Sequence, residues 1–141
     1  MTLEKWLLLP VFLQVLLIMV VGGLSGRARV MAVRSGKTRL KTIALNNEAW
    51  TGDVAKLGRN FDNQFQLPTV FFALVALLIA TVKVDAVFAI LAWMFVASRF
   101  AHSYVHTGSN VVVTRFRIYV FGFAILFLMW GWFAIKTLIL T

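Results

Sequence analysis

The chain has 141 residues, enough for one domain, and 61% of them are hydrophobic, against the roughly 45–50% usual in soluble domains. The absence of cysteine excludes disulfides, thiolate nucleophiles and cysteine-ligated metals. The net charge of +9 would suggest nucleic acid in a soluble protein, but in so apolar a chain it indicates loops beside anionic membrane lipids, and we expect no nucleic-acid partner.

Four apolar stretches are long enough to cross a bilayer, whose hydrocarbon core of about 30 Å takes roughly 20 helical residues. They predict helices over about residues 6–24, 60–82, 84–106 and 115–140, joined after the first helix by a basic loop over about residues 25–59. Only Lys83 and Asp85 separate the second apolar stretch from the third, so these two helices are expected to form a tight hairpin. The predicted fold is all-α: an integral membrane four-helix bundle, up-down-up-down, in one transmembrane domain over residues 1–141.

The first apolar stretch could also be the core of a cleaved signal peptide. Such peptides carry positive charge before the apolar core and a small-residue cleavage site after it. Here Glu4 and Lys5 cancel before the core, and Arg27, Arg29 and Arg34 follow it. This reversed order favours a retained helix.

Lysine and arginine are distributed unevenly between the two ends of the predicted bundle. The first loop holds eight basic residues, namely Arg27, Arg29, Arg34, Lys37, Arg39, Lys41, Lys56 and Arg59. Arg99, Arg115 and Arg117 lie around the third loop at the same end, whereas the opposite end has Lys5, Lys83 and Lys136. Because cytoplasmic loops carry the excess of positive charge, the first loop is predicted in the cytoplasm and both termini outside.

Polar residues just before the second apolar stretch form the segment RNFDNQFQLP, residues 59–68. If the helix begins before this segment, Asn60 and Asn63 lie on one face, flanked by Arg59 and Gln66. Their side chains would bond either to neighbouring helices or to a polar ligand, and each amide taken alone leaves both interpretations open.

Two further polar stripes occur where the third helix ends in SRFAHSYVH and the fourth begins TRFRIYVFG. On the third helix one face carries, at i, i+3, i+4 and i+7, Arg99, His102, Ser103 and His106. On the fourth helix Arg115 and Tyr119 share a face at i, i+4. Ionisable groups at membrane depth are costly unless they face protein, water or a ligand. The stripes therefore predict a cationic, hydrogen-bonding pocket for an anionic ligand, with a purely structural polar network as the alternative.

Other chemistries are poorly supported by the sequence. His102 and His106 have the i, i+4 spacing of metal ligands, but no third ligand is near and the adjacent arginines would repel a cation, so no metal site is predicted. We also expect no carboxylate within a helix, which argues against the proton or cation relays of small transporters.

Two motifs resemble the MAPEG superfamily (membrane-associated proteins in eicosanoid and glutathione metabolism), especially its short bacterial members. NFDNQFQLP followed by TVFFAL is similar to the polar start of that family's second helix. The spacing of Arg99, His102, Arg115 and Tyr119 is similar to the third-to-fourth helix pattern of microsomal prostaglandin E synthase and its relatives. The resemblance covers nearly the whole chain.

The resemblance implies a homotrimer in the bacterial inner membrane that binds glutathione as a cosubstrate between subunits, near the cytoplasmic face. It implies a transferase or peroxidase that acts on small lipophilic electrophiles from the bilayer. The glutathione-binding positions carried over from the family are Arg59, Asn60, Asn63, Gln66, Arg99, His102 and Tyr119. Arg115 takes the catalytic position, where a guanidinium favours the nucleophilic thiolate over the thiol.

Two residues depart from the family pattern at the implied site. Gln66 stands where the family usually has Glu, whose carboxylate would accept from the glutathione ammonium. His106 stands where relatives carry Tyr. The alternative function is therefore a non-catalytic membrane binding or scaffold protein with the MAPEG fold.

Overall fold

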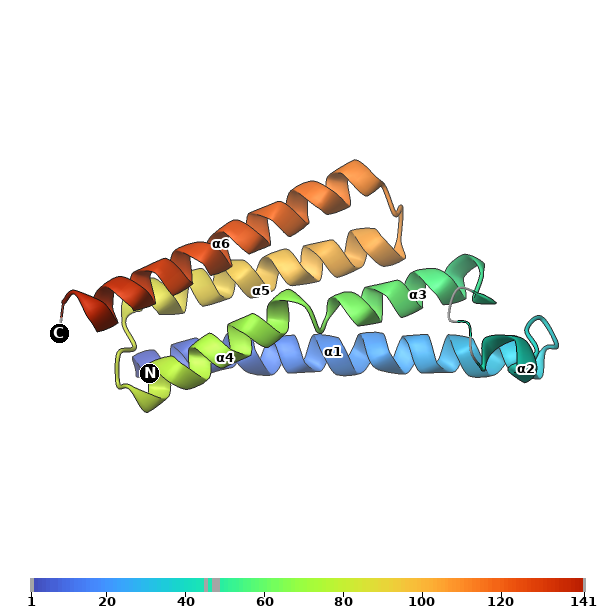
Figure 1. The fold of residues 1–141 in the computed structure, drawn as a ribbon, viewed down its shortest axis with the longest axis horizontal. Coiled ribbons are helices and arrows are strands. Elements are labelled where there is room, and N and C mark those ends of the chain that lie inside the picture. The colour runs from blue at the N-terminus through green and yellow to red at the C-terminus, as the bar shows by residue number, and fades with distance from the viewer. Residues whose placement is uncertain (1, 45, 47–48, 141) are drawn as a thin grey trace.

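The computed structural model describes residues 2–44, 46 and 49–140. Six α-helices are found in this part of the chain: α1 (Leu3–Arg34), α2 (Leu40–Ile43), α3 (Gly52–Asn63), α4 (Leu67–Ala80), α5 (Ala86–Thr107) and α6 (Val112–Leu138). Helix α1, the α3–α4 pair, α5 and α6 lie side by side along the long axis, and both ends of the chain lie at one end of the bundle (Figure 1). We call this the terminal end, and the opposite end, with α2 and the α5–α6 loop, the basic end.

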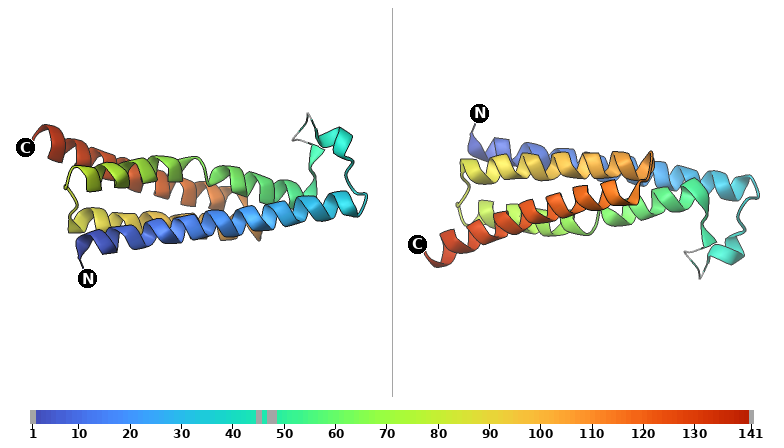
Figure 2. Two further views of the ribbon diagram at one scale, coloured as in Figure 1. Left: turned by 90° about the horizontal axis from the view of Figure 1, so that it is seen from below. Right: turned by 90° about the horizontal axis from the view of Figure 1, so that it is seen from above.

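Four helical segments are long and apolar enough to cross a membrane: Leu3–Arg34, Gly52–Ala80, Ala86–Thr107 and Val112–Leu138. Consecutive segments run in opposite directions, as the views in Figures 1 and 2 agree. Large apolar side chains such as Phe12, Met19 and Phe127 are 66–70% exposed on the outside of the bundle, where lipid would cover them. The predicted integral membrane four-helix bundle is confirmed.

The predicted bounds of the first loop were wrong at both ends. Helix α1 continues ten residues beyond the predicted end at residue 24, and α3 begins at Gly52. The length of the apolar run determines how many residues of a helix lie in the membrane, but the helix can continue beyond the membrane surface. Residues 25–34 contain no proline, and α1 ends only before Gly36, which has a φ of 72° that favours glycine.

The second predicted helix is divided into two helices at residues 64–66. Helix α3 ends at Asn63, and α4 begins at Leu67 with Pro68 in its first turn. Pro68 has no N–H to donate, and its ring would collide with the carbonyl four residues earlier in a continuous helix. Figure 1 shows the resulting bend between α3 and α4. Because α3 includes Asp62, the expectation that no helix carries a carboxylate was also wrong.

The apolar core lies in the terminal half of the bundle, between α4, α5 and α6. The rings of Phe71 and Phe95 stack with centroids 4.8 Å apart, and Leu74, Phe88 and Met129 are fully buried. In a bilayer such packing stabilises through van der Waals contact, because lipid is as apolar as the core. Small residues assist it: a Cβ on Gly122 would lie 2.7 Å from the Ser98 Oγ, so glycine there lets α6 approach α5.

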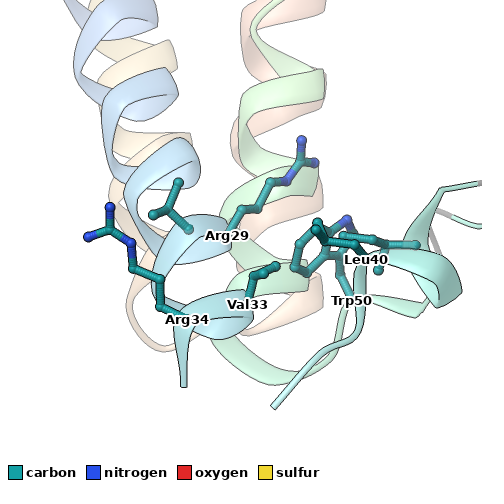
Figure 3. A pocket seen from close by; sticks show the side chains of 7 residues that line it. Arg29, Val33, Arg34, Leu40 and Trp50 are labelled. Atoms are coloured by element: carbon teal, nitrogen blue, oxygen red, sulfur yellow. The ribbon is translucent and has the colours of Figure 1, made fainter. Parts of the chain in front are cut away.

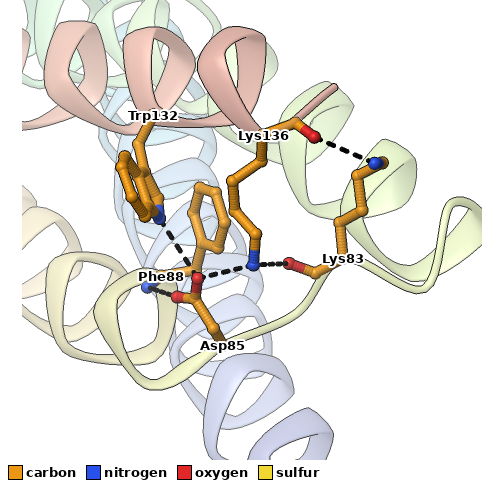
Figure 4. Close-up of polar contacts among 5 residues, drawn as sticks. All are labelled: Lys83, Asp85, Phe88, Trp132 and Lys136. Carbon is orange, nitrogen blue, oxygen red and sulfur yellow. Dashed lines mark hydrogen bonds and ion pairs between the residues drawn. The ribbon is translucent and has the colours of Figure 1, made fainter. Parts of the chain in front are cut away.

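A polar clasp joins the α4–α5 loop to the end of α6 (Figure 4). Asp85 accepts from Lys136 Nζ at 2.7 Å, from Trp132 Nε1 at 3.1 Å and from the Phe88 N–H at 3.1 Å. Lys83 Nζ in turn donates to the Lys136 carbonyl at 3.0 Å. Burial opposes ionisation of Asp85, but these hydrogen bonds together hold the pKa of its carboxyl below its ordinary value.

Candidate functional site

Polar side chains are buried from the middle of the bundle to its basic end. They are Gln14, Ser25, Asn60, Gln64, Ser98, Arg99, His102, Ser103 and His106. The α5 members repeat at intervals of three and four residues, so one face of this helix is polar over its last three turns. This face meets α3, α1 and α6, and it forms the floor of the candidate site.

One row of amides holds three helices together beneath the site. Gln14 Nε2 on α1 donates to Gln64 Oε1 at 3.1 Å, and Gln64 Nε2 donates to Asn60 Oδ1 at 3.3 Å. Asn60 Nδ2 then donates to Ser103 Oγ on α5 at 2.8 Å. The Asn60 amide, one of the predicted ligand-binding groups, is thus engaged within the protein, in the structural role that the sequence left open.

Arg99 is fully buried and lacks partners for most of its donors. Its Nη2 donates to the Asn63 carbonyl at 3.4 Å, and its Cζ lies 5.9 Å from the centre of the Tyr119 ring. Its Nε and Nη1 are buried without a hydrogen-bond partner. A buried guanidinium is strongly destabilising unless its charge and donors are matched. A hydrogen-bond acceptor placed beside these N–H groups would stabilise the guanidinium.

A cavity of about 190 Å³ lies among α3, α5 and α6, next to Arg99. It is lined by Asn63, His102, Val112, Arg115, Phe116 and Tyr119. A second cavity of about 480 Å³ lies nearer the basic end, and its polar lining includes Lys56, Arg59, His106 and Asn110. Arg115 lines both cavities and therefore lies between them.

Two side chains fix the position of Arg115. Its Nη1 lies 2.8 Å from Asn110 Oδ1 and 3.0 Å from His106 Nε2. Arginine can only donate, so His106 must accept with Nε2 and carry its proton on Nδ1. The two ion pairs found in the described part of the chain join Lys56 to Asp53 and Lys136 to Asp85, so neither Arg99 nor Arg115 has a carboxylate partner there.

The structure gathers some of the predicted site residues and separates others. Asn63, His102, Arg115 and Tyr119 surround the smaller cavity with Arg99 behind them, whereas Arg59 lines the larger one. Gln66 is exposed at the start of α4 and lines neither cavity. In the described residues no group of three or more His, Cys, Asp or Glu side chains is placed to hold a metal.

Sequence reasoning missed three residues of this region: Gln14, Gln64 and Asn110. Gln14 is the only strongly polar residue inside the first apolar stretch, and that isolation was a signal of a buried polar contact. Asn110 has a φ of 52°, a conformation that asparagine tolerates better than most residues, and it follows Gly108 and Ser109 in a turn-like segment.

A further cavity of about 390 Å³ lies at the tip of the basic end, apart from the candidate site (Figure 3). Its walls are mainly Val30, Val33, Leu40 and Trp50. The Arg29 guanidinium lies 5.5 Å from the centre of the Trp50 ring. This contact joins α1 to the segment that leads into α3, and so positions the start of α3.

No curated protein and no solved structure matches the chain significantly. A family model does: that of the MAPEG family matches residues 6–135, which is nearly the whole chain and includes every residue that lines the two cavities around Arg115. The match agrees with the four membrane-spanning helices and with the motifs in α3, α5 and α6. The chain belongs to the MAPEG family and is an integral membrane protein.

Proposed function

We propose that the protein is a glutathione-dependent transferase or peroxidase acting on small lipophilic electrophiles from the bilayer. The observation that carries this proposal is a pair of arginines without a carboxylate partner in the described residues. Arg115 lines the smaller cavity, and Arg99 is buried behind the Tyr119 ring in the wall of that cavity. Glutathione offers two carboxylates and an ionisable thiol. Charge-assisted hydrogen bonds from guanidinium groups are among the strongest available for such groups.

In the proposed chemistry Arg115 lowers the pKa of the glutathione thiol, whose proton leaves to water. The thiolate attacks an electrophilic carbon, so that an S–C bond forms while the leaving group departs with the electron pair of its own bond. His106 and Asn110 engage only Nη1 of Arg115, so the remaining N–H donors of the guanidinium can face the sulfur. Arg99 and His102 would hold the rest of the tripeptide.

The peroxidase version uses the same thiolate against a lipid hydroperoxide. The thiolate attacks the outer peroxide oxygen, the O–O bond breaks, and the lipid alcohol leaves after taking a proton. A second glutathione then attacks the resulting sulfenic acid, which gives the glutathione disulfide and water. The apolar rim of the smaller cavity, with Phe116 and Val112 65% and 63% exposed, lies where such a lipid would approach.

We further propose a homotrimer in the bacterial inner membrane, with the basic end in the cytoplasm and a neighbouring subunit completing the site. The smaller cavity, at about 190 Å³, is below the roughly 300–1,000 Å³ typical of small-molecule sites. Arg99 also has two buried donors without partners. Native mass spectrometry from mild detergent should show three subunits; a stable monomer that binds glutathione would contradict an intersubunit site.

The test of the activity is to replace Arg115 and measure conjugation of a lipophilic electrophile. Arg115→Ala should remove both the conjugating activity and the thiolate absorbance of bound glutathione, and Arg115→Lys should keep part of each because it retains charge without the planar fork. Arg27→Ala removes an exposed arginine from the same end of the protein and should leave activity unchanged. Equal activity in Arg115→Ala and wild type would contradict the proposal.

The second candidate function is a non-catalytic membrane binding or scaffold protein. It is favoured by Gln66, which carries no charge and lies outside both cavities, whereas the family pattern has a carboxylate at this position for the glutathione ammonium. On this account glutathione would bind weakly or not at all, and Arg115→Ala would affect stability alone.

A further inference from the structure

An apolar groove runs along the outer face of α5 and α6, away from the candidate site. It has a volume of about 490 Å³ and is lined by Met94, Ala97, Ser98, Ala101, Arg117, Ile118 and Phe121. Two alanines at i and i+4 leave room on α5 that larger side chains would fill. Arg117 is the single charged group in its lining.

The groove has a direction relative to the membrane. Ala101 and Arg117 are its residues nearest the basic end, whereas Met94 and Phe121 are nearest the middle of the bundle. From Met94 to Ala101 the α5 side of the groove is roughly 10 Å long, at about 1.5 Å per residue. Its apolar wall therefore lies inside the hydrocarbon layer and its cationic end faces the nearer lipid headgroups.

Arg117 is placed to meet an anion at that end. It lies five residues after the start of α6, roughly 7.5 Å into the helix at 1.5 Å per residue, and its side chain is exposed on the outside of the bundle. It forms no ion pair within the described residues. An arginine at this depth reaches the headgroup level by extending its guanidinium along the helix, and it is stabilised there by negative charge.

We propose that this groove binds one anionic phospholipid, with the phosphate on Arg117 and an acyl chain along Ala97, Ala101 and Phe121. Lipid headgroups supply phosphate at the level that the guanidinium reaches, and their chains run in the direction of the groove. A soluble anion would gain nothing from the apolar wall. A second copy of the chain would have to pair Arg117 with a carboxylate such as that of the exposed Asp62 in α3, and the number of subunits measured below separates this alternative from lipid.

The experiment is a native mass spectrometry titration of the detergent-solubilised protein with phosphatidylglycerol and with phosphatidylcholine. Wild type should bind one phosphatidylglycerol per subunit and retain it under washing that removes phosphatidylcholine. Arg117→Gln should weaken the apparent affinity about five- to tenfold, because one basic residue near the headgroups contributes about that factor or more. Arg27→Gln, which removes an exposed arginine outside the groove, should stay within about twofold of wild type.

Two further variants separate the chain-binding wall from the charge. Ala101→Leu fills the groove and should also weaken phosphatidylglycerol binding, whereas Ala124→Leu adds the same bulk on an exposed part of α6 outside the groove and should not. Arg117→Lys keeps the positive charge and should retain phosphatidylglycerol binding. If Arg117→Gln proves unstable, this variant shows whether the charge at residue 117 is sufficient for binding.

Four results would overturn the proposal. Arg117→Gln and Arg27→Gln could weaken binding equally, which would mean a diffuse surface potential. Phosphatidylcholine could bind as well as phosphatidylglycerol, which would mean that the groove does not select a lipid with net negative charge. Glycerol 3-phosphate could displace the lipid, which would indicate a soluble-anion site. Ala101→Leu could change the number of subunits instead of lipid binding, which would make the groove a subunit contact.

Discussion

Arg115 and His106 are linked by a 3.0 Å contact between Nη1 and Nε2, and this contact makes His106, which lines the larger cavity, a neutral acceptor. Asn110 accepts from the same nitrogen at 2.8 Å. The two acceptors come from the end of α5 and from the loop before α6. They position Arg115 without neutralising its charge, as a thiolate-binding role requires.

Replacing Asn110 by glycine should test this positioning. Because Asn110 has a φ of 52°, glycine removes the side-chain acceptor without backbone strain, whereas alanine adds strain. If Arg115 acts on the thiol, Asn110→Gly should lower kcat about fivefold with little change in KM, the effect of one hydrogen bond of about 1 kcal/mol. Steady-state kinetics over a range of glutathione concentrations measures kcat and KM separately. An unchanged kcat would mean that Arg115 needs no support from Asn110.

The amide row should contribute to stability more than to ligand binding. Asn60→Leu removes the donor to Ser103 Oγ and one of the two acceptors of Gln64 Nε2, whose bond to the residue-60 carbonyl at 3.3 Å remains. The substitution should destabilise the protein by about 1–2 kcal/mol. Thr81→Val, which removes an exposed side-chain bond to the Leu77 carbonyl, is the matched control and should have little effect. Thermal unfolding in detergent measures both. A stable Asn60→Leu variant that has lost glutathione binding would place Asn60 in the ligand site instead.

The clasp at the terminal end should make stability depend on pH in the acid range. The folded pKa of Asp85 lies below its ordinary value of 3.8, so its ionised form stabilises the fold at higher pH, and that stabilisation is lost as the pH falls through the folded pKa. Asp85→Asn should cost about 1 kcal/mol near neutral pH, and the difference from wild type should shrink below pH 3.8.

The control for that experiment is Asp53→Asn, which removes an ion pair to Lys56 whose carboxylate is 86% exposed. Exposed pairs of this kind contribute little, so its effect should stay below about 0.5 kcal/mol. Unfolding midpoints of wild type and of both variants, measured over a pH series, test these expectations. A constant difference between wild type and Asp85→Asn at every pH would show that Asp85 acts by packing alone.

The proposed orientation can be tested because the chain has no cysteine. Ser35 follows α1 at the basic end, and Leu140 lies at the terminal end and is 63% exposed. In intact cells Leu140→Cys should react with an impermeant thiol reagent, and Ser35→Cys should react only after the membrane is opened. The opposite labelling pattern would place the site outside the cytoplasm.

The number, type and order of the spanning helices could be predicted because bilayer thickness fixes the length of an apolar run. The extension of α1 to Arg34 could not, since a helix outside the membrane needs no apolar signal. Pro68 was a signal that a helix begins at Leu67. The apolar run extends on both sides of Pro68, however, and so gave no sign that the second predicted helix is divided there.

The candidate site was predictable to the extent that helical spacing decides which residues share a face. Arg99 and His102 meet Arg115 and Tyr119 because each pair repeats on one face and α5 packs against α6. The roles of the second-helix residues depended on the bend between α3 and α4. It brings Gln64 inward to Gln14 and leaves Gln66 exposed, which no periodic pattern could show.

The most direct test of the account is calorimetry of glutathione binding in two buffers that differ in ionisation enthalpy. If Arg115 stabilises the thiolate, binding should release close to one proton per site near neutral pH, where the free thiol is protonated. The analogue in which a methyl group replaces the thiol should bind through its carboxylates without releasing a proton. Absence of binding, or binding of glutathione with no proton release, would contradict thiolate formation at Arg115.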